Sequence, residues 1–301
     1  MERETFTAKD GKKISVCSWE DAAAPKAVVQ LSHGMAEHVA RYDAFARALN
    51  GRGYIVFGDD HRAHGMTDPD RLGLAEEGKD LFESTVSDLA ELTDDAKARY
   101  GLPVVLFGHS YGSFLSQRYL TLHSDKIAAC VLCGSALYGG ATAGFGRFVA
   151  SLKAKKHADE PGKMFAGMTF ESYDKKIGEG ANAWLSRNRE SNARFAADPL
   201  CGFTCSNGFY KYMFGGLARL AGDDYTSVRR DLPLFIIYGD RDYVGGCGKL
   251  TAKLVKKYEK AGLTVRSKSY PGARHELLNE TNADEVIADV LAFLDDVTGK
   301  A

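Results

Sequence analysis

The chain has 301 residues, with 39 lysines and arginines against 40 aspartates and glutamates and a formal net charge of −1. This balance, without any basic block, excludes a nucleic-acid-binding surface and argues against a polyanionic substrate. The length allows one large domain or one domain with an insertion, and we favour the insertion. No window approaches a membrane span and the first residues alternate as a strand does, so we expect a soluble, cytoplasmic protein.

The six cysteines agree with a reducing compartment, because disulfide scaffolds are usually short and cysteine-dense. Cys130 with Cys133, and Cys201 with Cys205, have spacings that could make a four-thiolate zinc site. The first pair lies inside an apolar run over residues 127–134, where cysteine behaves as a small hydrophobic residue. We therefore expect no zinc site from these four thiols.

In chain order, the first predicted element is a β-hairpin over residues 6–19, where apolar residues alternate with period two around Asp10-Gly11. A strand–helix–strand unit follows, and the same alternation continues beyond it. The elements expected are strands at 27–31, 54–57, 104–107 and 127–132, and helices at 41–51, 81–100 and directly after residue 110. This order predicts a mostly parallel sheet with helices on both faces.

The rhythm is lost between residues 135 and 230, where glycine, aromatic and lysine-rich stretches carry short helical patterns. It then resumes with strands at 234–238 and 265–270 and helices at 247–261 and 283–298. We therefore predict a core made of residues 1–134 and 231–301, divided by a helical cap insertion over residues 135–230.

The most informative motif is Gly-His-Ser-Tyr-Gly at residues 108–112, between an apolar strand and a helical pattern. This arrangement is typical of a nucleophile elbow, in which a sharp turn lifts Ser110 clear of its backbone. The helix N-terminus that follows favours the negative charge that acyl transfer creates.

A serine nucleophile needs a base and an orienting carboxylate, and both are expected at later strand ends. Asp240 and Asp242 follow the strand at 234–238, and His275 follows the strand at 265–270. The chain order serine, aspartate, histidine is the order of α/β-hydrolases.

These motifs together resemble the monoacylglycerol lipase and lysophospholipase branch of the α/β-hydrolases, which has a serine-aminopeptidase-like core. The resemblance spans nearly the whole core and rests on SHGMAEH at 32–38, DHRAHG at 60–65, GHSYG at 108–112, GDRD at 239–242 and GARHE at 272–276. In that family the orienting acid ends a Gly-x-x-Asp turn, which implies Asp242 here and leaves Asp240 as a turn cap. Ala63 stands where the family usually has glycine, a departure that affects loop geometry.

The oxyanion hole should be built from two backbone N–H groups, those of Tyr111 and Met35. Histidines at positions 33, 38, 61, 64 and 109 gather on loops at the same sheet edge. They lack paired carboxylates at ligand spacing, and the resemblance implies structural hydrogen bonding for them. We therefore predict no metal and no cofactor.

The cap is expected to select the substrate, although no substrate-binding residue is assigned. Residues 137–148 could form a lid or tunnel wall or an ordinary packed helix, and the aromatics at 201–204 and 209–214 could line an acyl pocket or form the cap's core. The lysines of residues 153–157 fit a solvated helix face, with transient contact to an anionic membrane surface as the alternative.

We interpret the chain as a serine hydrolase of carboxylic esters that uses Ser110, Asp242 and His275, with monoacylglycerol or lysophospholipid as the favoured substrate. A short-chain or aryl carboxylesterase is one alternative. An aminopeptidase is another, and it would need an acidic site for a free amino terminus, for which Asp159, Glu160 and Glu171 are candidates. A binding protein on the same fold is the non-enzymatic alternative.

Overall fold

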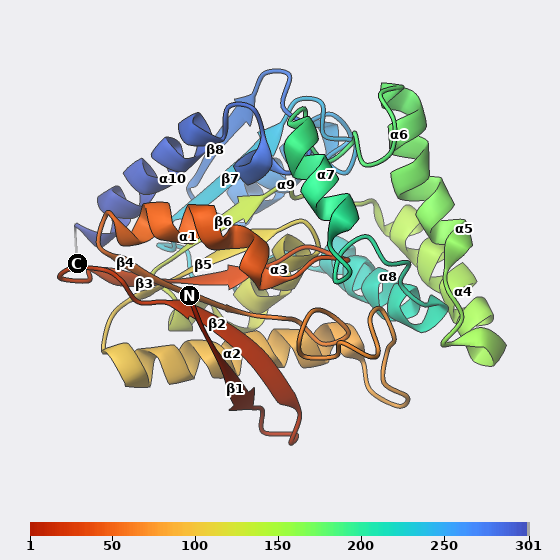
Figure 1. The fold of residues 1–301 in the computed structure, drawn as a ribbon, viewed down its shortest axis with the longest axis horizontal. Coiled ribbons are helices and arrows are strands. Elements are labelled where there is room, and N and C mark those ends of the chain that lie inside the picture. Colours follow the sequence, from red (N-terminus) through yellow and green to blue (C-terminus); the bar gives the residue numbers. More distant parts are fainter. Residues whose placement is uncertain (300–301) are drawn as a thin grey trace.

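The computed structural model describes residues 1–299 and is layered, with a central sheet covered by helices on both faces (Figure 1). Its 8 strands lie in the order β1-β2-β4-β3-β5-β6-β7-β8. The pairs β1–β2 and β2–β4 are antiparallel, and the neighbours from β4 to β8 are parallel. The strand bounds are β1 (Glu2–Thr7), β2 (Lys13–Trp19), β3 (Ala27–Ser32), β4 (Tyr54–Asp59), β5 (Val104–His109), β6 (Ala129–Cys133), β7 (Leu234–Gly239) and β8 (Val265–Tyr270).

Two groups of helices surround or extend this sheet. Those that accompany the strands are η1 (Val39–Tyr42), α1 (Asp43–Asn50), α2 (Leu81–Tyr100), α3 (Tyr111–His123), η2 (Ser124–Lys126), α9 (Lys249–Lys260), η4 (Leu277–Asn279) and α10 (Ala283–Thr298). Those between β6 and β7 are α4 (Gly140–His157), α5 (Lys163–Ala166), η3 (Gly167–Glu171), α6 (Ser172–Ile177), α7 (Arg189–Ala197) and α8 (Asn207–Gly222). We call this second part, residues 134–233, the helical segment.

Alternate residues of each central strand face opposite cores, as the period of a strand requires. Val29 and Phe107 pack with α1 and α10 on one face, while Val28 and Leu106 pack with α2 and α3 on the other. Burial on both faces explains why these strands are nearly continuous apolar runs.

The predicted α/β-hydrolase architecture is confirmed, including the amino-terminal hairpin and the parallel order. Small boundary differences have local causes. The helix expected from residue 247 begins at Lys249 because Cys247 and Gly248 have positive φ values of 52° and 83°, which no right-handed helix contains. Within residues 1–299, no helix combines the length and the apolar character needed to cross a membrane.

The helical segment lies at the end of the sheet toward which the parallel strands point (Figure 1). Its helix α4 packs along α8, and α8 also contacts α2 and α3. The carboxyl ends of the strands and the helical segment therefore face each other, which is where open α/β sheets bind their ligands.

Candidate active site

Ser110 stands at the turn between β5 and α3 in a strained conformation, with φ 52° and ψ −118°. A Cβ atom on Gly112 would lie 2.0 Å from the Ser32 carbonyl oxygen, and one on Gly108 would lie 2.2 Å from the Ser116 hydroxyl oxygen. The two glycines of the motif are therefore required by close contacts on both sides of the serine. The Ser110 N–H donates to the Cys133 carbonyl at 3.0 Å, which ties the turn to β6.

His275 and Asp242 come together from the loops that follow β8 and β7. The His275 Nδ1 and Asp242 Oδ2 atoms are 3.0 Å apart, and both residues are almost wholly buried. The second Asp242 oxygen accepts the Val244 N–H at 2.8 Å, so the carboxylate is held in one orientation. Asp240 is half exposed and accepts the Gly272 N–H at 2.8 Å, away from His275.

Ser110 and His275 line one cavity of about 250 Å³. The His275 Nε2 atom is buried and has no hydrogen-bond partner within the described residues. The Nδ1 side of the ring is occupied by Asp242, so the side left for chemistry is Nε2. The imidazole is further packed against Trp184, with ring centroids 5.1 Å apart.

The loop after β3 leaves one N–H group free beside the serine. Gly34 donates to the Glu37 carboxylate at 2.6 Å and Ala36 donates to His64 Nε2 at 3.1 Å. The Met35 N–H between them has no acceptor within residues 1–299. A Cβ atom on Gly34 would lie 3.3 Å from Ser110 Cβ, which places this loop next to the nucleophile. The Tyr111 N–H is the first of α3 and has no acceptor inside the helix.

A buried network of charged side chains anchors the loop after β3. Glu37 accepts hydrogen bonds from Arg41 and Tyr42, and Arg41 also makes two bonds of 2.7 Å to Glu276. Burial opposes the charge of Glu37, but Arg41 and His109 outweigh it and hold the Glu37 pKa well below its ordinary value. The loop is therefore anchored by a carboxylate that stays ionised.

His109, the residue before the nucleophile, faces oxygen on both sides of its ring. Its Nδ1 lies 3.2 Å from Glu37 Oε1 and its Nε2 lies 3.4 Å from the His275 carbonyl oxygen. Burial lowers the His109 pKa, but the hydrogen bond to Glu37 together with the negative charges of Glu37 and Glu276 outweighs this and leaves the pKa raised. Glu37 belongs to the motif SHGMAEH, so the sequence marks it as a residue of interest. Nothing in the spacing of the motifs predicts its contact with His109.

His33 and His64, two of the other histidines at this end of the sheet, make structural hydrogen bonds. His33 Nδ1 lies 2.7 Å from the Gly34 carbonyl, and His33 Nε2 accepts the His61 N–H at 2.9 Å. His64 Nδ1 donates to the Arg62 carbonyl at 3.0 Å, so its Nε2 is the acceptor for Ala36. Their ring nitrogens thus fix the loops after β3 and β4.

The helical segment supplies most of the cavity wall. No residue of 137–148, the stretch for which a lid or tunnel wall was one of two alternatives, lines the cavity, and Phe145 and Phe148 are exposed. The structure agrees with the packed-helix alternative for that stretch, because Ala143 is buried where α4 packs along α8 and Leu137 and Tyr138 pack against the core. The wall from this segment consists of Ala166, Phe170, Glu171, Asp174, Ala181, Asn182, Trp184, Leu185, Phe195, Gly202, Phe203, Thr204 and Tyr210.

In the two aromatic stretches, residues 201–204 and 209–214, some rings line the cavity and others pack inside the protein. Phe203 and Tyr210 line the cavity, while Phe209 packs against Tyr111 and Phe214 packs against Phe165. Trp184, which contacts the His275 ring, was missed by the sequence analysis. An isolated tryptophan outside any motif carries no signal for such a contact.

Of the acidic residues considered for an amino-terminus site, Glu171 lines the cavity, whereas Asp159 and Glu160 are exposed and do not. Cys130 and Cys133 lie on opposite faces of β6, in different cores, so their thiols do not meet. A four-thiolate site is therefore excluded by geometry.

A family model described as serine aminopeptidase, S33, matches residues 23–282. Among curated proteins, the chain is 28% identical over 306 residues to a monoacylglycerol lipase of Mycolicibacterium smegmatis, covering 96% of this chain and 95% of that one. It is also 26% identical to the mouse monoglyceride lipase, covering 90% of this chain and 82% of the relative.

Among solved structures, a thermostable carboxyl esterase from Bacillus coagulans in complex with glycerol superposes with a TM-score of 0.89 at 25% identity, covering 99% of this chain and 98% of that one. A soluble variant of monoglyceride lipase from Saccharomyces cerevisiae, in complex with a substrate analog, has a TM-score of 0.76 at 21% identity, covering 98% and 96% of the two chains. The second likeness bears on the fold alone.

Proposed function

The chain belongs to the serine aminopeptidase S33 family and hydrolyses carboxylic esters, and from this we propose that it is a monoacylglycerol or lysophospholipid hydrolase acting through Ser110, His275 and Asp242. The observation that carries the proposal is the arrangement around His275. Its Nδ1 is held by a buried carboxylate, while its Nε2 is left unpartnered at the wall of the cavity that Ser110 shares.

In the proposed mechanism, Ser110 Oγ attacks the ester carbonyl and His275 Nε2 takes its proton. Asp242 holds the imidazole in the tautomer that accepts at Nε2 and stabilises the imidazolium that forms. The negative oxygen of the tetrahedral intermediate receives hydrogen bonds from the Met35 and Tyr111 N–H groups. His275 then protonates the leaving alcohol, and a water activated by the same nitrogen releases the acid and restores Ser110.

The acyl subsite is proposed to be the aromatic wall over the cavity. We propose that residues 135–230 act as a cap over the core of residues 1–134 and 231–301. Phe170, Trp184 and Phe203 supply rigid apolar surface next to the reacting groups, which suits a hydrocarbon chain. The names of the mycobacterial and mouse relatives support the same substrate class.

The proposal is tested by kcat/KM on a monoacylglycerol series from acetyl to oleoyl, with an aryl acetate alongside and Ser110→Ala as the blank. We expect kcat/KM to rise with chain length, because each methylene adds apolar contact in the acyl subsite. The Ser110→Ala variant should lose roughly 10⁴-fold or more of kcat. Activity confined to the aryl acetate would identify a small-ester hydrolase instead, and unchanged turnover in Ser110→Ala would refute the triad.

An aminopeptidase activity is the second candidate, and Glu171 in the cavity wall is the observation that favours it. A carboxylate there could bind a free amino terminus. Aminoacyl amides and their amino-acetylated counterparts, assayed on the same preparation, distinguish the two. Turnover of only the free amines, lost in Glu171→Gln, would support the peptidase.

We also propose transient contact between the cap and an anionic membrane surface. On α4, Phe145, Phe148 and Leu152 are 68%, 60% and 59% exposed. The same helix carries Arg147 and the lysines of residues 153–156, with no acidic residue. An exposed apolar ridge with basic neighbours fits the interfacial region of anionic lipid. Sedimentation with vesicles with and without phosphatidylglycerol tests this. Binding of the double variant Phe145→Ser, Phe148→Ser equal to that of the unaltered chain would contradict the proposal.

The cytoplasm is the compartment we propose. All six cysteines are free thiols, and four of them are buried in the folded protein. Unpaired cysteines agree with a reducing environment. Fractionation of cells that express the tagged chain tests this assignment.

A further inference from the structure

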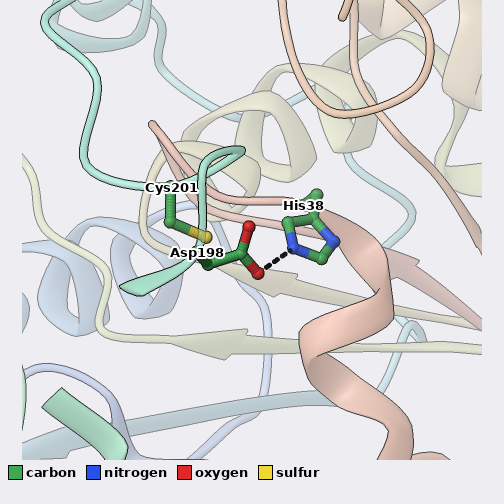
Figure 2. A group of neighbouring side chains, drawn as sticks. All are labelled: His38, Asp198 and Cys201. Atoms are coloured by element: carbon green, nitrogen blue, oxygen red, sulfur yellow. Dashed lines mark hydrogen bonds and ion pairs between the residues drawn. The ribbon is translucent and has the colours of Figure 1, made fainter. Parts of the chain in front are cut away.

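Three side chains of different ligand chemistry meet where the loop after β3 touches the turn after α7 (Figure 2). They are His38, Asp198 and Cys201, and each offers a ligand atom within 4.8 Å of the other two. None of them belongs to the proposed Ser110 machinery. An imidazole nitrogen, a carboxylate oxygen and a thiolate sulfur are the donor types that Zn²⁺ prefers.

The turn that carries two of these ligands is well ordered by hydrogen bonds. The Cys201 N–H donates to the Asp198 carbonyl at 3.0 Å, closing a β-turn with Pro199 at its second position. The Leu200 N–H donates to Asp198 Oδ1 at 2.9 Å. Backbone geometry therefore holds the carboxylate and the thiol on the same side of one turn.

His38 completes the group from the opposite side. Its Nε2 lies 2.9 Å from Asp198 Oδ2, and the residue is 7% exposed. Asp198 and Cys201 are only partly buried, so an ion can reach the group from solvent. Nearby Arg41 is already neutralised by Glu37 and Glu276, which leaves an excess of negative charge around the group.

We propose that His38, Asp198 and Cys201 form a binding site for a borderline or soft divalent cation of the Zn²⁺ class, with water as the fourth ligand. Zn–S distances of about 2.3 Å and Zn–N distances of about 2.0 Å require ligand atoms roughly 3.5 Å apart. Side-chain rotations that move the ligand atoms by about 1 Å bring them from separations of up to 4.8 Å to that spacing. Mg²⁺ and Ca²⁺ are excluded, because they do not favour thiolate and imidazole ligands.

Binding releases protons in a defined way. The cation replaces the proton on Cys201 Sγ, which goes to solvent. At His38 the proton now donated to Asp198 moves from Nε2 to Nδ1, so that Nε2 can bind the cation. The shift gives up the hydrogen bond from Nε2 to Asp198 Oδ2, which the bonds to the cation replace. The Nδ1 atom has no partner among the described residues, so no other hydrogen bond of His38 is lost. Because the thiol must lose its proton to bind the cation, affinity should increase with pH.

The site joins the helical segment to the loop after β3, which carries the Met35 N–H proposed for the oxyanion hole. Next to Cys201, the Gly202 N–H donates to the Ala36 carbonyl at 2.9 Å, one residue from Met35. A bound cation would replace a single side-chain hydrogen bond by coordinate bonds across this junction. Where the proposed function also holds, we expect Zn²⁺ to slow ester hydrolysis by restricting the segment that lines the cavity.

The test is spectroscopic and independent of catalysis. The full-length chain is treated with a chelator, desalted and titrated with Co²⁺, whose thiolate complexes give an intense near-ultraviolet charge-transfer band. We expect the band in the unaltered chain, its displacement by Zn²⁺, and no effect of Mg²⁺. Cys201→Ser should abolish the band, and His38→Gln and Asp198→Asn should weaken binding at least about tenfold.

Cys247→Ser is the matched control, because Cys247 is exposed and lies outside the group. Circular dichroism establishes that each variant is folded. No thiolate band, or a band that survives Cys201→Ser but disappears in Cys247→Ser, would overturn the proposal. Because the readout is ligation, a metal site without lipase activity and a lipase without a metal site give different results.

Discussion

The sheet edge that carries Ser110 and the wall that covers it are built on different principles. At this edge, meaning the carboxyl ends of the parallel strands, backbone contacts leave no room for a side chain at Gly112, where a Cβ atom would lie 2.0 Å from a carbonyl oxygen. In the wall, apolar rings stack on one another, as Phe170 and Trp184 do at 4.7 Å between centroids. Packing of this kind tolerates exchange of side chains. We therefore propose that the strand ends around Ser110 set the reaction chemistry and that the wall sets the choice of substrate.

The sharpest test of the edge is a pair of neighbouring carboxylates that differ in contact. Asp242→Asn keeps the shape but loses the charge that orients His275, and we expect kcat to fall roughly 10⁴-fold. Asp240→Asn should change kcat less than about twofold, because Asp240 contacts only the Gly272 N–H and the exposed Arg241 side chain in a half-exposed turn. Steady-state kinetics on a water-soluble ester measures both.

Comparable large losses in the two variants would mean that both carboxylates are needed, and small losses in both would mean that either acid can orient the histidine. A large loss in Asp240→Asn alone would move the orienting role to that residue. Thermal unfolding of each variant separates both outcomes from simple misfolding.

A second test compares a glycine of the elbow with a glycine of α4, in the helical segment but outside the cavity wall. Gly112→Ala places a Cβ atom against the Ser32 carbonyl, and we expect a loss of more than about 3 kcal/mol in unfolding free energy and at least about 10² in kcat. Gly144→Ala in α4 meets nothing within 4 Å and should stabilise the chain by about 0.5–1 kcal/mol. Urea unfolding measures both changes.

Tolerance of alanine at position 112 with normal activity would show that the edge adapts as readily as the wall. The comparison between the regions would then fail. A matching loss at Gly144 would instead show that α4 is as tightly packed as the elbow.

The edge was largely predictable from the sequence because its residues follow strands in order. Ser110, Asp242 and His275 each come directly after a parallel strand, so topology brings them to one edge. Their contacts with other elements were not predictable. Glu37 meets His109 and His38 meets Asp198 only through tertiary packing, with no fixed spacing in the chain.

The wall was less predictable still. The sequence pattern of an apolar helix is the same whether the helix faces a cavity or solvent, so for residues 137–148 the sequence left a lid or tunnel wall and a packed helix as alternatives. Trp184 lies in a stretch without helical or strand period, so its position over His275 depends on the whole segment. Where a side chain points is decided here by packing partners distant in sequence.

The pH dependence of the unfolding free energy tests the role of the buried histidines that hold the loops after β3 and β4. Burial lowers the pKa of His64 to about 4 from an ordinary value of 6.5. Between pH 6.5 and pH 4 the unfolded chain binds a proton there and the folded chain does not, so unfolding free energy falls as pH falls across this window. We expect His64 alone to account for up to about 3 kcal/mol of this loss.

His64→Gln keeps a donor for Arg62 and an acceptor for Ala36 but does not titrate, so the loss of stability toward pH 4 should be smaller in it. Urea unfolding at pH 7, 6, 5 and 4.5 gives the comparison, with exposed His157→Gln as the control. An identical pH slope in His64→Gln and the unaltered chain would show that His64 is not what makes the edge acid-sensitive.

The smallest effect is expected in the wall, where a side chain changes selectivity and leaves the reaction intact. Phe170→Ala removes a ring that lines the cavity and stacks on Trp184, so kcat/KM for long acyl chains should fall about tenfold while that for acetyl esters changes less than about twofold. Leu122→Ala is the control, because Leu122 is 47% exposed and lies outside the lining. The cavity of about 250 Å³ is just below the usual range of about 300–1,000 Å³ for ligand pockets, so loss of the ring also enlarges a confined space. A drop of equal size for every ester would mean that Phe170 acts through Trp184 on His275, and the wall would then belong to the catalytic apparatus as much as the edge does.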